Sequence, residues 1–203
     1  MTVLDPFRSD GVVMPTTGSE PCYVPDRWND AVLRATHNCY SYALNQLLNG
    51  ARMNKPQPGE HAGKIITRKD EITCRAISQF ILDDNPMDVR GPIDSVTALS
   101  LPCSRNEYRI ALAVSEGEDY HFMRQDHDGM WSHKPGATEV SRVDASGRAI
   151  AVPHEADWNW SKKGGINYAH FCGYFCVTSS PSTRIGSHVN QAIAPQVEGL
   201  YPS

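Results

Sequence analysis

One cysteine lies where a polar turn meets an expected helix, and this position suits a nucleophile. Thr36 and Asn38 are residue types that cap helix N-termini, and residues 40–48 form a short apolar-rich run that an Asn-Gly pair closes. A thiol in the first turn of such a helix faces unpaired backbone N–H groups and the positive end of the helix dipole, which favour the thiolate. Cys39 is therefore a candidate nucleophile, and the alternative is that it is buried as a small apolar residue.

Two histidines that could serve such a nucleophile lie on an expected β-hairpin. An Asp-Gly turn separates residues 120–125 from residues 130–133, and both segments contain residues that favour strands. A register that opposes position 133 to position 121 or 123 puts His121 and His133 on the same face of the sheet. A slip of one residue would put them on opposite faces.

With these features the chain resembles the NlpC-type cell-wall peptidases, which belong with the CHAP amidases to the papain-like cysteine hydrolases. The resemblance rests on a cysteine at a helix start, a strand that opens with histidine, a glycine turn and a second histidine, and it covers about residues 28–136. It implies a papain-like fold with Cys39 as the nucleophile, His121 as the base and His133 as the group that orients the base. The family has Asp-Cys-Ser-Gly where this chain has Asn-Cys-Tyr-Ser, which leaves the substrate class open.

The proposed chemistry needs three groups. Attack on an amide or ester carbonyl requires a thiolate, a base that can later protonate the leaving group, and a group that fixes the tautomer of the base. The cysteine and the two histidines supply these roles, although each histidine could instead be an ordinary core residue. Alternative orienting groups are the turn residues Asp119, Asp126 and Asp128. His37 is an alternative base, but it stands too close to the cysteine in sequence to face it.

Composition excludes several classes of protein. The 203 residues, of which 40% are hydrophobic and 21% charged, suit one ordinary globular domain. No apolar run approaches the roughly 18 residues that a membrane helix needs, so no membrane span is expected. The net charge of −4 argues against a nucleic-acid partner. Residues 1–8 lack a basic start and an apolar core, so they do not read as a signal peptide and indicate synthesis in the cytoplasm.

The expected cytoplasmic setting also determines how the cysteines are interpreted. Without an export signal, reduced thiols are the expected state of the six cysteines. Cys172 and Cys176 are expected on one strand, about 13 Å apart, which is too far for a bridge between them. No Cys-x-x-Cys pair is present, and a metal site built from His121, His127 and His133 lacks a carboxylate at a recognised spacing. No metal and no cofactor is expected.

Three segments are expected along the chain. Residues 1–27 form an N-terminal extension, residues 28–178 form the papain-like catalytic domain, and residues 179–203 form a C-terminal extension that is draped over the surface or disordered. Helices that precede an antiparallel sheet make an α+β architecture. The papain-like core would therefore have N-terminal helices packed on an antiparallel β-sheet.

Further elements follow from periodicity. Residues 70–82 have apolar residues at helical spacing and predict an amphipathic helix. Residues 86–102 are expected to form a loop with a short helix, and residues 168–178 a final strand. Trp158 and Trp160 bracket a polar loop residue, where they either line a cleft or pack under the loop.

The first functional hypothesis is a cysteine-dependent amide hydrolase that acts through a thioester acyl-enzyme. By the resemblance, its partner is a peptide or peptidoglycan substrate, and the chain is a bacterial or phage protein that a dedicated secretion or lysis route delivers. A host-directed cysteine protease, a deamidase or an acyltransferase toxin would use the same residues, and a cognate immunity protein or inhibitor stays unknown. The second hypothesis is a non-catalytic binding or assembly module in which Cys39 is buried.

Overall fold

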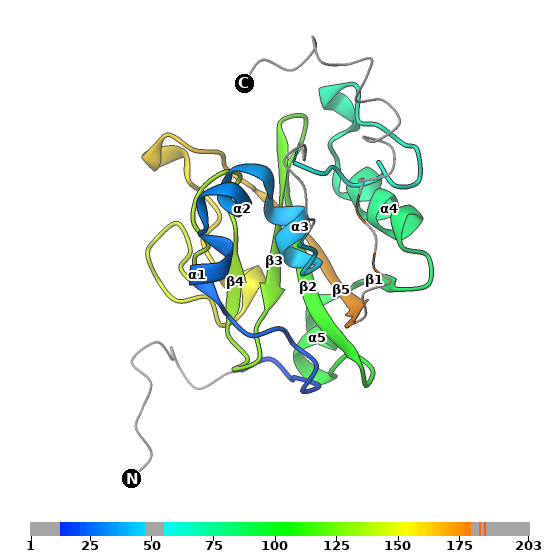
Figure 1. Cartoon of the computed structure of the whole chain (residues 1–203), viewed down its shortest axis with the longest axis vertical. Helices are drawn as coiled ribbons and strands as arrows, with labels where there is room; N and C mark the ends of the chain where they lie inside the picture. Colours follow the sequence, from blue (N-terminus) through cyan, green and yellow to red (C-terminus); the bar gives the residue numbers. More distant parts are fainter. Residues whose placement is uncertain (1–12, 48–54, 180–182, 184, 186–203) are drawn as a thin grey trace.

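The fold is built on an antiparallel sheet that helices cover. The computed structural model describes residues 13–47, 55–179, 183 and 185 (Figure 1). Within this part of the chain, the five strands have the spatial order β1-β5-β2-β3-β4. They are β1 (Val89–Ile93), β2 (Glu107–Ser115), β3 (Asp119–Gln125), β4 (Trp131–His133) and β5 (His170–Thr178). The α-helices are α1 (Pro25–Trp28), α2 (Ala31–Thr36), α3 (Cys39–Ala43), α4 (Cys74–Asp84) and α5 (Ser95–Ser100).

Short 3-10 helices complete the described elements, at Lys69–Glu71 (η1), Pro153–Glu155 (η2) and Ser161–Lys163 (η3). None of the described helices has the length and apolar character to cross a membrane.

Helix α3 begins where the sequence predicts and ends earlier. The side chain of Asn38 accepts a hydrogen bond from the backbone N–H of Ser41, and the Ser41 hydroxyl accepts one from the Asn38 backbone N–H, which forms a capping box. The helix ends at Ala43 because Asn45 takes a positive φ of 51°, a left-handed conformation that a helix cannot continue through. The predicted extension toward residue 48 is therefore wrong.

Helix α4 confirms the amphipathic helix predicted near residues 70–82. Its first turn is capped by Thr73, whose side-chain oxygen accepts a hydrogen bond from the N–H of Ala76. Ile77 and Ile81, one turn apart, are fully buried against the sheet.

The sheet is covered on both faces. On one face Tyr120 and Phe122 of β3 pack in a core with residues of α3 and α4. On the other face Met123 packs in a second core with Ala98 of α5 and with Trp158. The central strand β2 is buried from Tyr108 through Val114, and apart from Arg109 and the tyrosine hydroxyl this stretch of its sequence is apolar.

Strand β1 lies in the region predicted to be loop, beside the expected short helix α5. Its sequence, Val-Arg-Gly-Pro-Ile, contains residues that disfavour strands. The segment is nevertheless extended because it pairs with β5 at the sheet edge, where Val89 opposes Val177. Proline is tolerated there because the outer side of an edge strand has no partner strand.

Two disulfides form, and the prediction of reduced thiols is wrong for these cysteines. Cys172 and Cys176 do lie on one strand, β5, and are not joined to each other, as predicted. Each is bonded instead to a distant cysteine, in the pairs Cys74–Cys172 and Cys103–Cys176. The bonded cysteines are 98 and 73 residues apart in sequence, so local spacing could not predict the pairs. Both disulfides join other segments to the same strand, β5.

The N-terminal segment packs on the sheet. Met14 is buried, and its carbonyl oxygen accepts a hydrogen bond from the side chain of Gln125. The Thr17 hydroxyl donates to the carbonyl of Glu107. The domain boundaries at residues 27 and 178 stay predictions, and most of the expected C-terminal extension, residues 179–203, lies outside the described residues.

Candidate functional site

The β3–β4 hairpin brings the two candidate histidines together. Met123 opposes His133 in the register of the two strands, so the conditional prediction of a same-face arrangement for His121 and His133 is confirmed. The Nε2 atom of His121 lies 2.8 Å from the Nδ1 atom of His133. Both imidazoles are buried.

The hydrogen bonds define the tautomers of this pair. The Nε2 atom of His133 lies 3.0 Å from the carbonyl oxygen of Val143, which can only accept, so this nitrogen carries the proton. Burial lowers the pKa of His133 to about 4 and holds the pKa of His121 well below its ordinary value, so both rings are neutral at pH 7. The Nδ1 atom of His133 is then an acceptor, and the Nε2 atom of His121 donates to it. The Nδ1 atom of His121 is left as an acceptor.

Cys39 lies apart from the two histidines, on the opposite face of the sheet. Side chains alternate along a strand, and Cys39 belongs to the core that contains Tyr120 and Phe122, whereas His121 points the other way. The thiol lies 3.9 Å from the carbonyl oxygen of Tyr120. Burial raises the pKa of Cys39 to about 12, so the thiol is protonated at neutral pH. The structure therefore brings together two of the three predicted catalytic side chains, and Cys39 is not one of them.

The alternative orienting groups have structural partners. Asp119 accepts a hydrogen bond from the hydroxyl of Tyr168 at 2.9 Å. Asp126 is buried and forms ion pairs with Arg124 and Arg142. Asp128 also pairs with Arg142, at 2.6 Å. None of these carboxylates is hydrogen-bonded to the histidine pair; Tyr168, the partner of Asp119, packs against His121 with ring centroids 5.2 Å apart.

The alternative base, His37, is buried as well. Its ring packs edge-on against Trp28, with ring centroids 5.8 Å apart, and its Nδ1 atom lies 2.9 Å from the hydroxyl of Thr36. Burial lowers the pKa of His37. These contacts are those of a core residue.

An aromatic-walled pocket opens beside the histidine pair. We call it the aromatic pocket; its volume is about 380 Å³, and its lining includes His121, Pro135, Trp160, Lys163, Ile166 and Tyr168. Trp158 is buried beneath it and contacts both imidazoles, with ring centroids 5.8 Å from His121 and 5.3 Å from His133. Of the two interpretations of the tryptophan pair, Trp158 packs under the loop and Trp160 lines a cavity.

The sequence signal for this pocket was incomplete. The two tryptophans mark it, but Lys163 and Ile166 stand in a polar stretch with no motif. Lys163 is exposed and its ammonium lies 5.2 Å from the ring centroid of Trp160. The end of η3 and the loop that follows it bring these side chains into the same pocket as His121.

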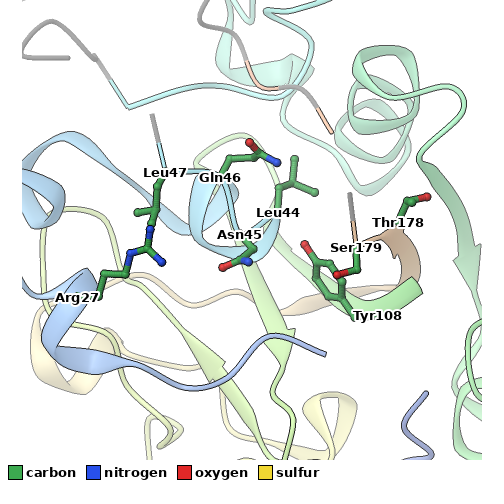
Figure 2. Close-up of a pocket in the computed structure, with 8 residues that line it drawn as sticks. All are labelled: Arg27, Leu44, Asn45, Gln46, Leu47, Tyr108, Thr178 and Ser179. Carbon is green, nitrogen blue, oxygen red and sulfur yellow. The ribbon is translucent and has the colours of Figure 1, made fainter. Parts of the chain in front are cut away.

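A second pocket, of about 370 Å³, is lined by residues of α1, of the segment after α3 and of the strands β2 and β5 (Figure 2). Arg27 and the segment Leu44–Leu47 stand on one side of it, and Tyr108, Thr178 and Ser179 on the other. Residues 48–54 and 180–182, which continue the chain from two of its walls, lie outside the described residues. No function is assigned to this pocket.

Potential metal ligands gather at one point in the described part of the chain, at Cys103, Glu107 and Cys176. The two cysteines form a disulfide there, and a disulfide sulfur cannot bind a metal as a thiolate. Glu107 is engaged by the guanidinium of Arg90 at 2.7 Å. These three residues therefore have a structural role, through the disulfide and the ion pair.

Comparison with known proteins identifies a relative of a different kind from the peptidases. The chain is 35% identical over 135 residues to insoluble matrix shell protein 1 of Ruditapes philippinarum, and the match spans 66% of this chain and 80% of the relative. No family model matches the chain. No solved structure matches it either, so the papain-like assignment of the fold stays a prediction.

These findings correct the functional interpretation. The resemblance to NlpC-type and CHAP enzymes is wrong, as are the inferred cysteine hydrolase activity and the bacterial or phage effector role, because the matching relative is a shell matrix protein. The inferred cytoplasmic setting is wrong as well, since two disulfides are typical of proteins that fold in an oxidising compartment. The chain belongs to the family of insoluble matrix shell protein 1.

Proposed function

We propose that this chain is a non-catalytic structural domain of an extracellular insoluble matrix. The observation that carries the proposal is its 35% identity to insoluble matrix shell protein 1 across 80% of that protein's length. Similarity over most of a relative's length supports a shared role for the whole domain, beyond a shared motif. The role corresponds to the alternative of a binding or assembly module with a buried Cys39.

The described fold supports a role outside the cell. The disulfides Cys74–Cys172 and Cys103–Cys176 fasten an α-helix and a loop to strand β5. Bonds that close loops of this length restrict the unfolded chain and stabilise a domain by about 2–4 kcal/mol each. They persist where no thiol-reducing system operates, as in a matrix outside cells.

The state of Cys39 supports a non-catalytic role. Its thiol is buried, protonated and separated from both imidazoles by the sheet. A nucleophilic cysteine needs a thiolate fraction and access for a substrate. Neither requirement is met.

Fractionation of the tissue that expresses the chain tests this proposal. The extracellular material is extracted with salt and then with detergent, thiols are blocked with an alkylating reagent at the start, and peptides are identified by mass spectrometry. We expect peptides of this chain in the insoluble residue, with Cys74 joined to Cys172 and Cys103 to Cys176. Recovery in the soluble cytosolic fraction, with all four of these cysteines alkylated, would contradict the proposal.

An activity control separates structure from catalysis. The oxidised chain and its Cys39→Ala variant are incubated with denatured protein and with peptidoglycan, and products are analysed by mass spectrometry. We expect no product that depends on Cys39.

A further inference from the structure

One hydrogen-bonding group of the aromatic pocket belongs to the histidine pair. His121 is 3% exposed and lines the pocket. Its Nε2 atom is used by His133 at 2.8 Å, and its Nδ1 atom has no hydrogen-bond partner within residues 13–47 and 55–179. Among the described residues, the fully buried side-chain atoms without a hydrogen bond do not include this Nδ1 atom, so it keeps some accessible surface.

The tautomers of the two histidines make the Nδ1 atom of His121 a hydrogen-bond acceptor. The carbonyl oxygen of Val143 accepts a hydrogen bond from Nε2 of His133, and Nδ1 of His133 accepts one from Nε2 of His121. The lone pair at Nδ1 of His121 can therefore accept a hydrogen bond from a ligand. Burial keeps the pKa of His121 well below its ordinary value, so the lone pair is present at neutral pH.

The rest of the pocket favours an aromatic ligand. Trp160, Ile166 and Tyr168 supply walls that are apolar, and the volume of about 380 Å³ falls in the range of about 300–1,000 Å³ that small-molecule sites have. Aromatic rings prefer offset or edge contacts with other rings, which Trp160 and Tyr168 can offer.

Three polar groups around the pocket already have partners within the protein. The hydroxyl of Tyr168 donates to Asp119, the carbonyl of Pro135 accepts from Thr138, and the carbonyl of Gly136 accepts from the ammonium of Lys134. A sugar would bury several hydroxyls against walls that offer few partners, and each unpaired hydroxyl would cost free energy. A ligand with one donor on a flat apolar ring matches the site better.

We propose that the aromatic pocket binds a phenolic ring, with its hydroxyl donating to the Nδ1 atom of His121 and its ring lying between Trp160 and Tyr168. The phenol is either a free molecule or the side chain of a tyrosine on a partner. The proposal concerns a ligand site, so it stands or falls separately from the matrix role.

Matched ligands test the proposal on the unmodified, oxidised full chain. Binding is followed by two-dimensional NMR on the indole N–H signals, with p-cresol and toluene as one pair and N-acetyltyrosinamide and N-acetylphenylalaninamide as the other. We expect p-cresol to bind about tenfold more tightly than toluene, since one hydrogen bond to an unpaired acceptor is worth about that factor. Binding of N-acetyltyrosinamide in addition identifies the tyrosine side chain as a ligand, whereas binding of p-cresol alone identifies a free phenol.

Variants locate the acceptor. His121→Phe keeps the volume of the ring and removes the nitrogen, so p-cresol and toluene should bind equally. His127→Phe changes an exposed histidine in the β3–β4 turn, and it should keep the tenfold preference. Circular dichroism checks that both variants are folded.

Several outcomes would overturn the proposal. Equal binding of p-cresol and toluene to the unmodified chain would show an apolar cavity without a functional acceptor. Binding of N-acetylglucosamine but not of p-cresol would identify a sugar site. No binding of any of these ligands at millimolar concentration would remove the pocket as a ligand site.

Discussion

At Cys39 two effects act on the same thiol in opposite directions. The start of helix α3 favours the thiolate through its N–H groups, an effect of about 1 kcal/mol. Burial opposes it, and the pKa of about 12 against an ordinary value of 9.0 corresponds to roughly 4 kcal/mol in favour of the thiol. Helix α3 is only five residues long, so its dipole cannot offset the loss of water. Desolvation therefore decides the chemistry of this residue.

Native thiol labelling tests this balance. Cys22 is free and exposed, whereas Cys39 is free and buried. With a coloured aromatic disulfide reagent at pH 8, we expect one thiol per folded chain to react within minutes and a second only after denaturation. Cys22→Ser should abolish the fast reaction, and Cys39→Ser should leave it unchanged. Rapid labelling of Cys39 in the folded chain would contradict the assigned burial.

The histidine pair predicts a dependence of stability on pH. The pKa of His133 is about 4 in the folded chain, against an ordinary value of 6.5. Between these values the unfolded chain binds a proton that the folded chain does not, so the free energy of unfolding falls as the pH falls from 6.5 to 4. The expected loss from this residue is about 3 kcal/mol, and His121 changes it in the same direction.

Urea unfolding at several pH values measures this effect. His133→Asn removes one titrating group, and its free energy of unfolding should change less between pH 6.5 and 4 than that of the unmodified chain. An identical pH slope in the two proteins would assign the acid sensitivity to other groups.

Among the elements, α3 and the β3–β4 hairpin are joined by a buried charged cluster. Arg124 on β3 is fully buried, pairs with Asp126 at 3.3 Å and lies over the ring of Tyr42 at 4.1 Å. It also donates to the carbonyl of Cys22. One guanidinium therefore connects the N-terminal segment, a helix and a strand. This arrangement needs the carboxylate, because an unpaired buried charge is costly.

Asp126→Asn tests the cluster. The change keeps the size of the side chain and removes the charge that faces two arginines, so we expect a loss of about 3 kcal/mol in the free energy of unfolding. Asp26→Asn, at an exposed position of α1, should change stability by less than about 0.5 kcal/mol. Equal stability of the two variants would show that the cluster is not stabilising.

In the whole molecule, strand β5 is the point to which distant segments are fastened. It lies between β1 and β2 in the sheet and carries one cysteine of each disulfide (Figure 1). Helix α4 and the segment after α5 are thereby held to the strand that ends the described domain. The two disulfides thus join Cys74 and Cys103 covalently to β5.

Removal of one disulfide tests how much the attachment to β5 stabilises the fold. The double variant Cys74→Ser/Cys172→Ser should lose about 2–4 kcal/mol of stability, seen as a lower midpoint of urea unfolding. Reduction of the unmodified chain with dithiothreitol should lower the midpoint further, because both disulfides are then open. If reduction leaves the midpoint unchanged, the disulfides do not restrain the unfolded chain.

Local pattern by itself determined the hairpin, the amphipathic helix α4, the final strand and the cap at Asn38. These features depend on residues near one another in the chain, where side-chain period and turn chemistry act directly. It also placed His121 and His133 on one face once the register was assumed.

Only the tertiary structure decided what these residues do. The side of the sheet on which α3 packs separates Cys39 from His121, although helix position and spacing had suggested a nucleophile and its base. The partners of Cys172 and Cys176 stand 98 and 73 residues away, and η3 with the loop after it brings Lys163 and Ile166 into the same pocket as His121. These arrangements depend on contacts between distant segments and on which groups are desolvated. Local sequence patterns predict neither.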